Sequence, residues 1–71
     1  MPLKEQLDRL VGDLVMKGIR YEDAQREFEK RYIAEVLSRE DGNLGRAADA
    51  LGMHRNTLSR KMATYRIRRS A

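Results

Sequence analysis

Residues 43–65 read NLGRAADALGMHRNTLSRKMATY, and this stretch decides the fold that we expect. Its apolar positions recur at helical spacing in two short segments, residues 44–51 and about 54–65. Gly52 separates the segments and supplies the backbone conformation of a tight turn. The small side chains at 47–48 let the second helix cross the first closely and at a steep angle. The stretch therefore predicts a helix-turn-helix.

Local signals indicate where these two helices begin and which side of each faces the core. Asn43 is a favourable N-cap, because its side-chain oxygen can accept from a free backbone N–H group. Either His54 or Asn56 could cap the second helix in the same way. The side chains expected to face inward are Ala47, Ala48, Leu51, Leu58, Met62 and Tyr65.

Two longer amphipathic helices are expected upstream. Residues 3–17 carry an apolar stripe at spacings of three and four, and Gly18 is a plausible C-cap. Residues 21–39 open with the acids Glu22 and Asp23, which favour a helix N-terminus. Two helices cannot cover both apolar faces alone, so we expect another subunit to cover the excess. The expected dimer interface is Leu7, Leu10, Val11, Leu14, Phe28, Tyr32 and Val36.

The length of 71 residues suits one all-α domain, residues 1–71. A chain this short buries only about 60% of the surface that its unfolded form exposes, so its own core is marginal. Small folds of this kind often gain stability from a partner subunit. Within the domain we expect dimerisation helices at 3–39, a helix-turn-helix at 43–65 and a basic tail at 66–71 that frays.

The charge is divided unevenly along the chain. Residues 1–40 hold 8 Lys and Arg against 9 Asp and Glu, whereas residues 41–71 hold 7 against 2. From Gly52 onward there are six cations and no acid. A near-neutral front and a basic rear indicate that the rear meets a polyanion, although a solvated basic tail would look the same.

The outward face of the last helix is rich in cations and hydrogen-bonding side chains, which suits the major groove of duplex DNA. Arg55 can pair with guanine and Asn56 with adenine, because both offer two-pronged hydrogen bonding. Thr57, Arg60 and Lys61 are better suited to phosphates, which position a protein without reading sequence. The expected DNA-binding residues are Asn43, Arg46, His54, Arg55, Asn56, Thr57, Ser59, Arg60, Lys61 and Thr64.

A family resemblance rests on the same residues. Residues 42–62, GNLGRAADALGMHRNTLSRKM, resemble the Fis-type helix-turn-helix, with the pattern "GN…AA..LG..R.TL..K" at matching spacing. This module forms the nucleoid protein Fis and the C-terminal domain of NtrC-type regulators. Residues 28–33, FEKRYI, with Val36 and Leu37, are similar to the helix that precedes it in NtrC-type domains. The resemblance covers residues 20–67 well and the first helix more loosely.

The resemblance implies an intertwined two-fold dimer, in which the first two helices of each subunit form a four-helix core. It also implies that Arg55, Thr57, Arg60 and Lys61 fall where the family contacts DNA, and Asn43 matches a further family position. There are departures from Fis. His54 stands where Fis has an asparagine, and cations of Fis are replaced here by Ser59 and Thr64. Fewer cations on this helix predict weaker nonspecific binding.

Other functions find little support in the composition. With no cysteine and only His54 as histidine, we expect no metal and no cofactor. So short a chain could hardly enclose a substrate, so we expect neither an enzyme nor a small-molecule ligand. No run approaches the roughly 20 apolar residues of a membrane span, and the start lacks the apolar stretch of a signal peptide. We therefore expect a cytoplasmic protein of the nucleoid that binds double-stranded DNA as a homodimer.

Three alternatives stay open at this point. The front helices could be a protein-interaction module beside an incidental basic helix. The chain could bind RNA, although a single helix reads A-form grooves poorly. It could also be the excised DNA-binding domain of a larger NtrC-type regulator. The DNA-binding role itself could be transcription regulation or architectural bending.

Overall fold

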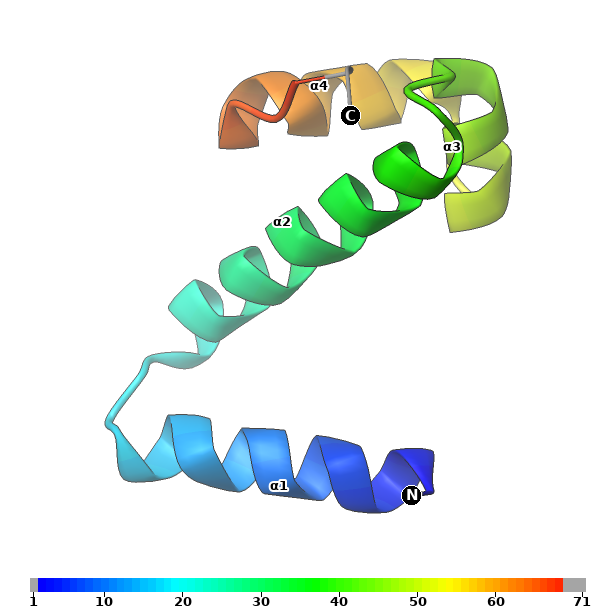
Figure 1. The fold of residues 1–71 in the computed structure, drawn as a ribbon. Coiled ribbons are helices and arrows are strands. Elements are labelled where there is room, and N and C mark those ends of the chain that lie inside the picture. Colours follow the sequence, from blue (N-terminus) through cyan, green and yellow to red (C-terminus); the bar gives the residue numbers. More distant parts are fainter. Residues whose placement is uncertain (1, 69–71) are drawn as a thin grey trace.

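The computed structural model describes residues 2–68, which fold into four helices: α1 (Leu3–Met16), α2 (Tyr21–Arg39), α3 (Leu44–Leu51) and α4 (Arg55–Tyr65). No strand occurs within this range. In Figure 1, α2 crosses the molecule as a diagonal rod, with α3 and α4 at its C-terminal end and α1 folded back below it. The predicted all-α class and the four helices are confirmed.

Two predicted helix bounds shift by one residue for local reasons. α1 ends at Met16, and Lys17 caps its C-terminus before Gly18 turns the chain in the left-handed region with a φ of 73°. α4 begins at Arg55 because His54 has an extended backbone, with φ −70° and ψ 145°, and acts as its N-cap. The C-cap is therefore Lys17 and not Gly18, which follows it at positive φ, a conformation that glycine adopts at little cost.

The helices end in one recurring hydrogen-bonded motif, in which a backbone N–H beyond the end reaches back to the last turn. After α1 the Ile19 N–H donates to the Leu14 carbonyl at 3.1 Å, and after α3 the Met53 N–H donates to the Ala48 carbonyl at 3.0 Å. The motif satisfies carbonyls that would otherwise lack a partner and sets a definite exit direction for the chain.

The same motif closes α4 and orders the residues just beyond it. Arg66 has a positive φ of 55°, and the Ile67 N–H donates to the Met62 carbonyl at 2.9 Å. The Ile67 side chain packs against the core. The prediction that the tail frays is therefore wrong for these two residues, and residues 69–71 of the predicted basic tail lie outside the described range.

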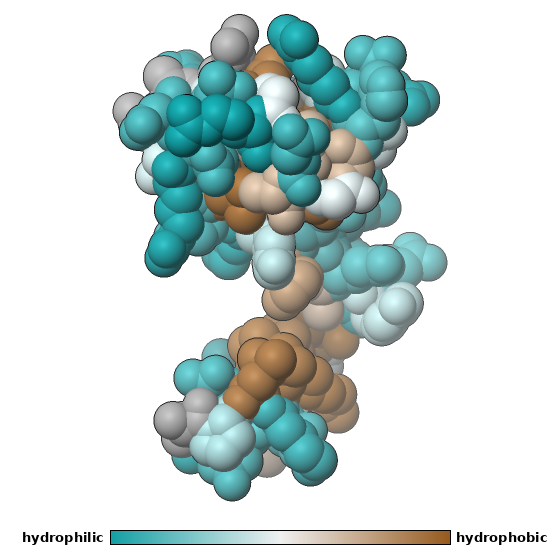
Figure 2. Space-filling view, turned by 90° about the vertical axis from the view of Figure 1, so that its right-hand side faces the viewer, coloured by the Kyte–Doolittle hydropathy of each residue, from teal (hydrophilic) through white to brown (hydrophobic). Residues whose placement is uncertain are grey.

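The core joins α2, α3 and α4 and leaves α1 out. Its buried members are Ile33, Leu37, Ala47, Ala48, Leu58 and Met62. The predicted inward-facing residues of the helix-turn-helix all belong to this core or pack against it. α1, in contrast, contains no buried residue. Figure 2 shows the result, with an apolar surface over the lower part of the molecule and mainly hydrophilic side chains above it.

The turn between α3 and α4 depends on Gly52, whose φ is 72°. A Cβ atom added there would meet nothing within 4 Å, so the effect of Gly52→Ala is purely conformational. We expect this change to lower the free energy of unfolding by about 1–2 kcal/mol, the cost of a left-handed L-residue. Urea denaturation followed by circular dichroism measures the difference.

Gly45→Ala is the matched control for Gly52→Ala. Gly45 lies inside α3, and its added Cβ would be 3.6 Å from the Asn43 side-chain oxygen, an ordinary contact. Alanine favours helix by up to about 1 kcal/mol over glycine, so this variant should be as stable as the parent or more so. Equal destabilisation by both substitutions would contradict the conformational role of Gly52.

Candidate nucleic-acid interface

α4 is anchored along one side and open along the other. Leu58 and Met62 fix its inner side, with exposed fractions of 0% and 7%. On the other side, Asn56, Ser59 and Arg60 are exposed. Burial of the inner side against α2 and α3 holds the helix at a definite angle, so the outer side chains project from a fixed base. The predicted inward side of the last helix is thus confirmed by burial.

Capping explains how both helices of the helix-turn-helix begin. The Asn43 Oδ1 atom accepts from the Arg46 backbone N–H at 3.0 Å, as predicted. Of the two candidates for α4, His54 is the cap, since its Nδ1 atom accepts from the Asn56 backbone N–H at 3.0 Å. In a neutral imidazole whose Nδ1 accepts, the ring hydrogen lies on Nε2. This outcome leaves the Asn56 side-chain amide without a hydrogen bond among the described residues.

The cations of the helix-turn-helix fall into two groups. Arg55 and Arg60 are exposed and form no ion pair within residues 2–68. Arg46 and Lys61 are each paired with an acid. The Arg46 Nε atom lies 3.0 Å from Glu40, and the Lys61 Nζ atom lies 3.1 Å from Glu29. The first group is electrostatically available to a polyanion, whereas the second is partly neutralised by the protein itself.

Lys61 is the clearest departure from the sequence-based picture. It was expected on the outward face, but its side chain is only 35% exposed and its Nζ atom lies 3.1 Å from Glu29 Oε2. The physical reason is helical position: Lys61 lies one turn before Tyr65, on the flank of α4 that faces α2. The expectation that it projects freely from the outer face is therefore wrong.

Glu29 is the residue that sequence reasoning missed. Its carboxylate accepts hydrogen bonds from the Lys61 ammonium and from the Tyr65 hydroxyl. These two donors, with Tyr65 first, hold the pKa of Glu29 below its ordinary value, and the same bond raises the pKa of Tyr65. In the sequence Glu29 is one of several acids on a polar helix face, so only a contact across 32 residues singles it out.

The remaining predicted DNA-binding residues are uncharged polar side chains that differ in exposure and in hydrogen bonding. Ser59 is exposed and Thr57 is half-buried. Thr64 is exposed, but its hydroxyl donates to the Arg60 carbonyl of the preceding turn at 3.0 Å. Because its one hydroxyl proton is used in this bond, Thr64 can still accept a hydrogen bond but has no proton to donate to a phosphate oxygen.

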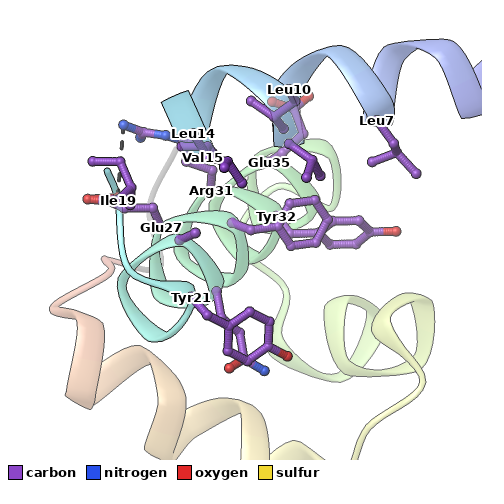
Figure 3. Close-up of a pocket in the computed structure, with 14 residues that line it drawn as sticks. Leu7, Leu10, Leu14, Val15, Ile19, Tyr21, Glu27, Arg31, Tyr32 and Glu35 are labelled. Carbon is purple, nitrogen blue, oxygen red and sulfur yellow. Dashed lines mark ion pairs between the residues drawn. The ribbon is translucent and has the colours of Figure 1, made fainter. Parts of the chain in front are cut away.

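Six of the seven predicted dimer residues line an open groove between α1 and α2. The exposed fractions of Leu10, Val11, Phe28 and Tyr32 are 46%, 54%, 53% and 54%. Figure 3 shows the side chains of Leu7 and Leu10 from α1 facing the same space as Tyr32 of α2. The groove has a volume of about 910 Å³.

Two of the seven predicted dimer residues are less open than the others. Leu14 lines the groove but is half-buried. Val36 does not line the groove and packs instead against the core of its own subunit. The reason is the long α2, whose C-terminal half belongs to the core of the helix-turn-helix while its N-terminal half faces α1.

No helix within residues 2–68 is long and apolar enough to cross a membrane. In the same range, no group of three or more His, Cys, Asp or Glu side chains could hold a metal ion.

The capped, steeply joined α3 and α4 with an exposed polar outer side define the class of helix-turn-helix DNA-binding proteins. Comparison with known families gives the particular member of this class. The profile of the bacterial regulatory proteins of the Fis family matches residues 24–65, and the chain belongs to this family of non-enzymatic DNA-binding proteins. The chain matches no curated protein and no solved structure. The resemblance noted in the sequence is thereby confirmed.

The cap of α4 can be tested at His54. His54→Ala removes the acceptor for the Asn56 N–H, and loss of an N-cap side chain costs about 0.5–2 kcal/mol of stability. We expect His54→Asn to retain most of the stability, because asparagine is a preferred N-cap residue. Thermal unfolding of both variants measures this, and an alanine variant as stable as the parent would contradict the capping role.

Proposed function

We propose that this protein acts as a homodimer that binds duplex DNA with sequence preference and so regulates transcription. The observation that carries the proposal is the geometry of α4, which is buried along one side and presents unpaired arginines and free polar groups along the other. The family membership supports DNA binding itself. The homodimer and the regulatory role are our inference.

Base reading is assigned to the first turn of α4. Residues near the start of a recognition helix are those that face base edges in helix-turn-helix complexes. Arg55 is exposed and unpaired among the described residues, and Asn56 keeps its amide free because His54 provides the cap. Guanidinium and amide groups can each form two hydrogen bonds to one base, to guanine and adenine respectively. Thr57, on the following position, supplies a further contact.

Backbone positioning is assigned to residues around this reading turn. Arg60 is exposed one turn beyond Asn56 and has no internal acid partner in the described range. Asn43 and Arg46, at the start of α3, lie where the first motif helix crosses the duplex backbone in this class. Phosphate contacts of this kind fix the register of the protein without selecting a sequence.

The homodimer is inferred from α1, which has no core of its own. An isolated helix of 14 residues is marginal in water, and none of its residues is buried in the subunit. Its apolar stripe faces α2 across the open groove, with Leu7 still 42% exposed. A surface of this kind is stable only when it is covered, which requires a partner.

A second copy of the chain fits this requirement. The groove is formed by two apolar helix faces, and α1 and α2 of a partner carry the same two faces. A two-fold axis would therefore place like surfaces against each other and build a four-helix core. The same axis would set two copies of α4 on one side of the dimer, as a helix-turn-helix dimer needs for successive half-sites about 34 Å apart.

DNA binding should depend steeply on salt, because each neutralised phosphate contributes a slope of about −0.9 to log K against log salt.

We expect Arg55→Ala to cost about 1–3 kcal/mol on a preferred site and to flatten the difference between sequences. Arg60→Ala should weaken all sequences alike and reduce the slope by about one. Fluorescence anisotropy on selected and scrambled duplexes checks both. Identical behaviour of the two variants would contradict the division between base and phosphate contacts.

The dimer can be tested with a charge placed in the groove. Leu10→Asp should dissociate or unfold the protein, because a buried, unpaired carboxylate is costly in an apolar interface. Gln6→Asp adds the same charge on α1 at an exposed position outside the groove, and it should leave the dimer intact. Sedimentation equilibrium at micromolar concentration measures the molecular mass. A folded, monomeric parent protein would overturn the homodimer. If Leu10→Asp selectively abolished binding to another protein, the groove would instead belong to a protein-interaction module.

A further inference from the structure

Among the described residues, the ion pair between Glu29 and Lys61 differs from the three ion pairs within single helices and from the Arg46–Glu40 pair, in which the Arg46 side chain is 63% exposed. The three pairs within single helices have side chains that are all at least 60% exposed, whereas Glu29 and Lys61 are 33% and 35% exposed. Exposed pairs of the first kind contribute little and exchange freely with water. The Glu29 pair also joins two different helices, α2 and α4. We therefore expect the Glu29–Lys61 pair to persist in solution more than the exposed pairs do.

A third group strengthens this pair. The Tyr65 hydroxyl donates to the same carboxylate that accepts from the Lys61 ammonium. Lys61 and Tyr65 lie one turn apart on α4, so Glu29 bridges two consecutive turns of the recognition helix. Hydrogen bonds to a carboxylate favour its charged form, and the pKa of Glu29 is accordingly lowered. Glu29 is therefore anionic at neutral pH.

The location of this cluster gives it a consequence for binding. Lys61 follows Arg60 directly in the sequence, and Arg60 is a proposed phosphate contact. A lysine side chain is long and flexible, and a free ammonium at this position would be within reach of the same backbone. The Glu29 carboxylate offers anionic oxygens, as a phosphate does. It already accepts hydrogen bonds from the Lys61 Nζ atom, at 3.1 Å to Oε2 and 3.2 Å to Oε1.

We propose that Glu29 is an internal competitor of the DNA backbone: it holds Lys61 against α2 and so removes one cation from the phosphate contacts of α4. The proposal rests on the proposed function, and it identifies Glu29 as a positioning residue that sets the strength of nonspecific binding. Lys61 then serves the attachment of α4 to α2, while Arg60 serves the duplex. Sequence-independent affinity is kept low by this arrangement, which leaves a larger share of binding to the base-reading turn.

The test is the salt dependence of duplex binding by the full chain, measured on a scrambled duplex by anisotropy. Glu29→Gln keeps the shape of the side chain and removes its charge, so Lys61 is released. We expect the slope of log K against log salt to steepen by about 0.9 and the affinity at 0.1 M salt to rise roughly fivefold to tenfold. The double variant Glu29→Gln with Lys61→Met should return to the slope of the parent.

A second arm does not depend on the folding of the Glu29 variant. In the parent background, Lys61→Met should leave the slope unchanged, whereas Arg60→Met should reduce it by about one. Equal reductions by both substitutions would show that Lys61 contacts phosphate in the complex and would overturn the proposal.

Asp8→Asn is the matched charge control, since Asp8 pairs with Lys4 in an exposed ion pair on α1 and does not line the groove. It should leave the slope at the parent value. If it steepened the slope as much as Glu29→Gln, the effect would belong to net charge and the proposal would fail. A parent protein that binds no duplex at about 50 mM salt would instead overturn the proposed function.

Discussion

The close packing of two alanines under a leucine is the contact on which the rest of the molecule depends. Ala47 and Leu58 are fully buried, and Ala48 is 2% exposed, so the small side chains of α3 leave room for Leu58 of α4 to pack closely against them. This crossing is possible because Gly52 turns the chain at positive φ. Once the inner side of α4 is committed to this contact, its polar outer side has a single direction in which to project, and the DNA-facing surface follows from it.

The remainder of the chain divides its apolar residues between two interfaces. The C-terminal half of α2 supplies Ile33 and Leu37 to the core of its own subunit, whereas the N-terminal half and α1 frame an open groove. Within residues 2–68, six buried hydrophobic side chains make a small core for a chain of 71 residues. In the proposed homodimer the groove supplies the missing burial, so folding, dimerisation and placement of the two recognition helices become a single equilibrium.

The cations of the helix-turn-helix are likewise divided, into those paired with acids and those that are unpaired. Two cations of the helix-turn-helix are paired with acids, Lys61 with Glu29 of α2 and Arg46 with Glu40 just beyond the end of α2, while Arg55 and Arg60 have no such partner within the described residues. A net positive charge therefore overstates how much of the surface is offered to a polyanion. The distinction matters for a DNA-binding protein, because unpaired cations raise affinity for every sequence, whereas specific recognition depends on the difference between sequences.

The sequence alone determined the four helices, the inward side of the helix-turn-helix and the family. It also determined the cap at Asn43 and limited the cap of the last helix to His54 or Asn56. All of these features rest on local spacing and turn chemistry. The structure decided that His54, and not Asn56, caps α4, which is a choice between two local hydrogen bonds. Only the tertiary structure decided that Val36 packs against the core of α2, α3 and α4 and that Lys61 turns inward to Glu29. The physical reason is that the partner of a polar side chain on a helix flank is set by the angle between helices. That angle results from core packing and cannot be read from residues 32 positions apart.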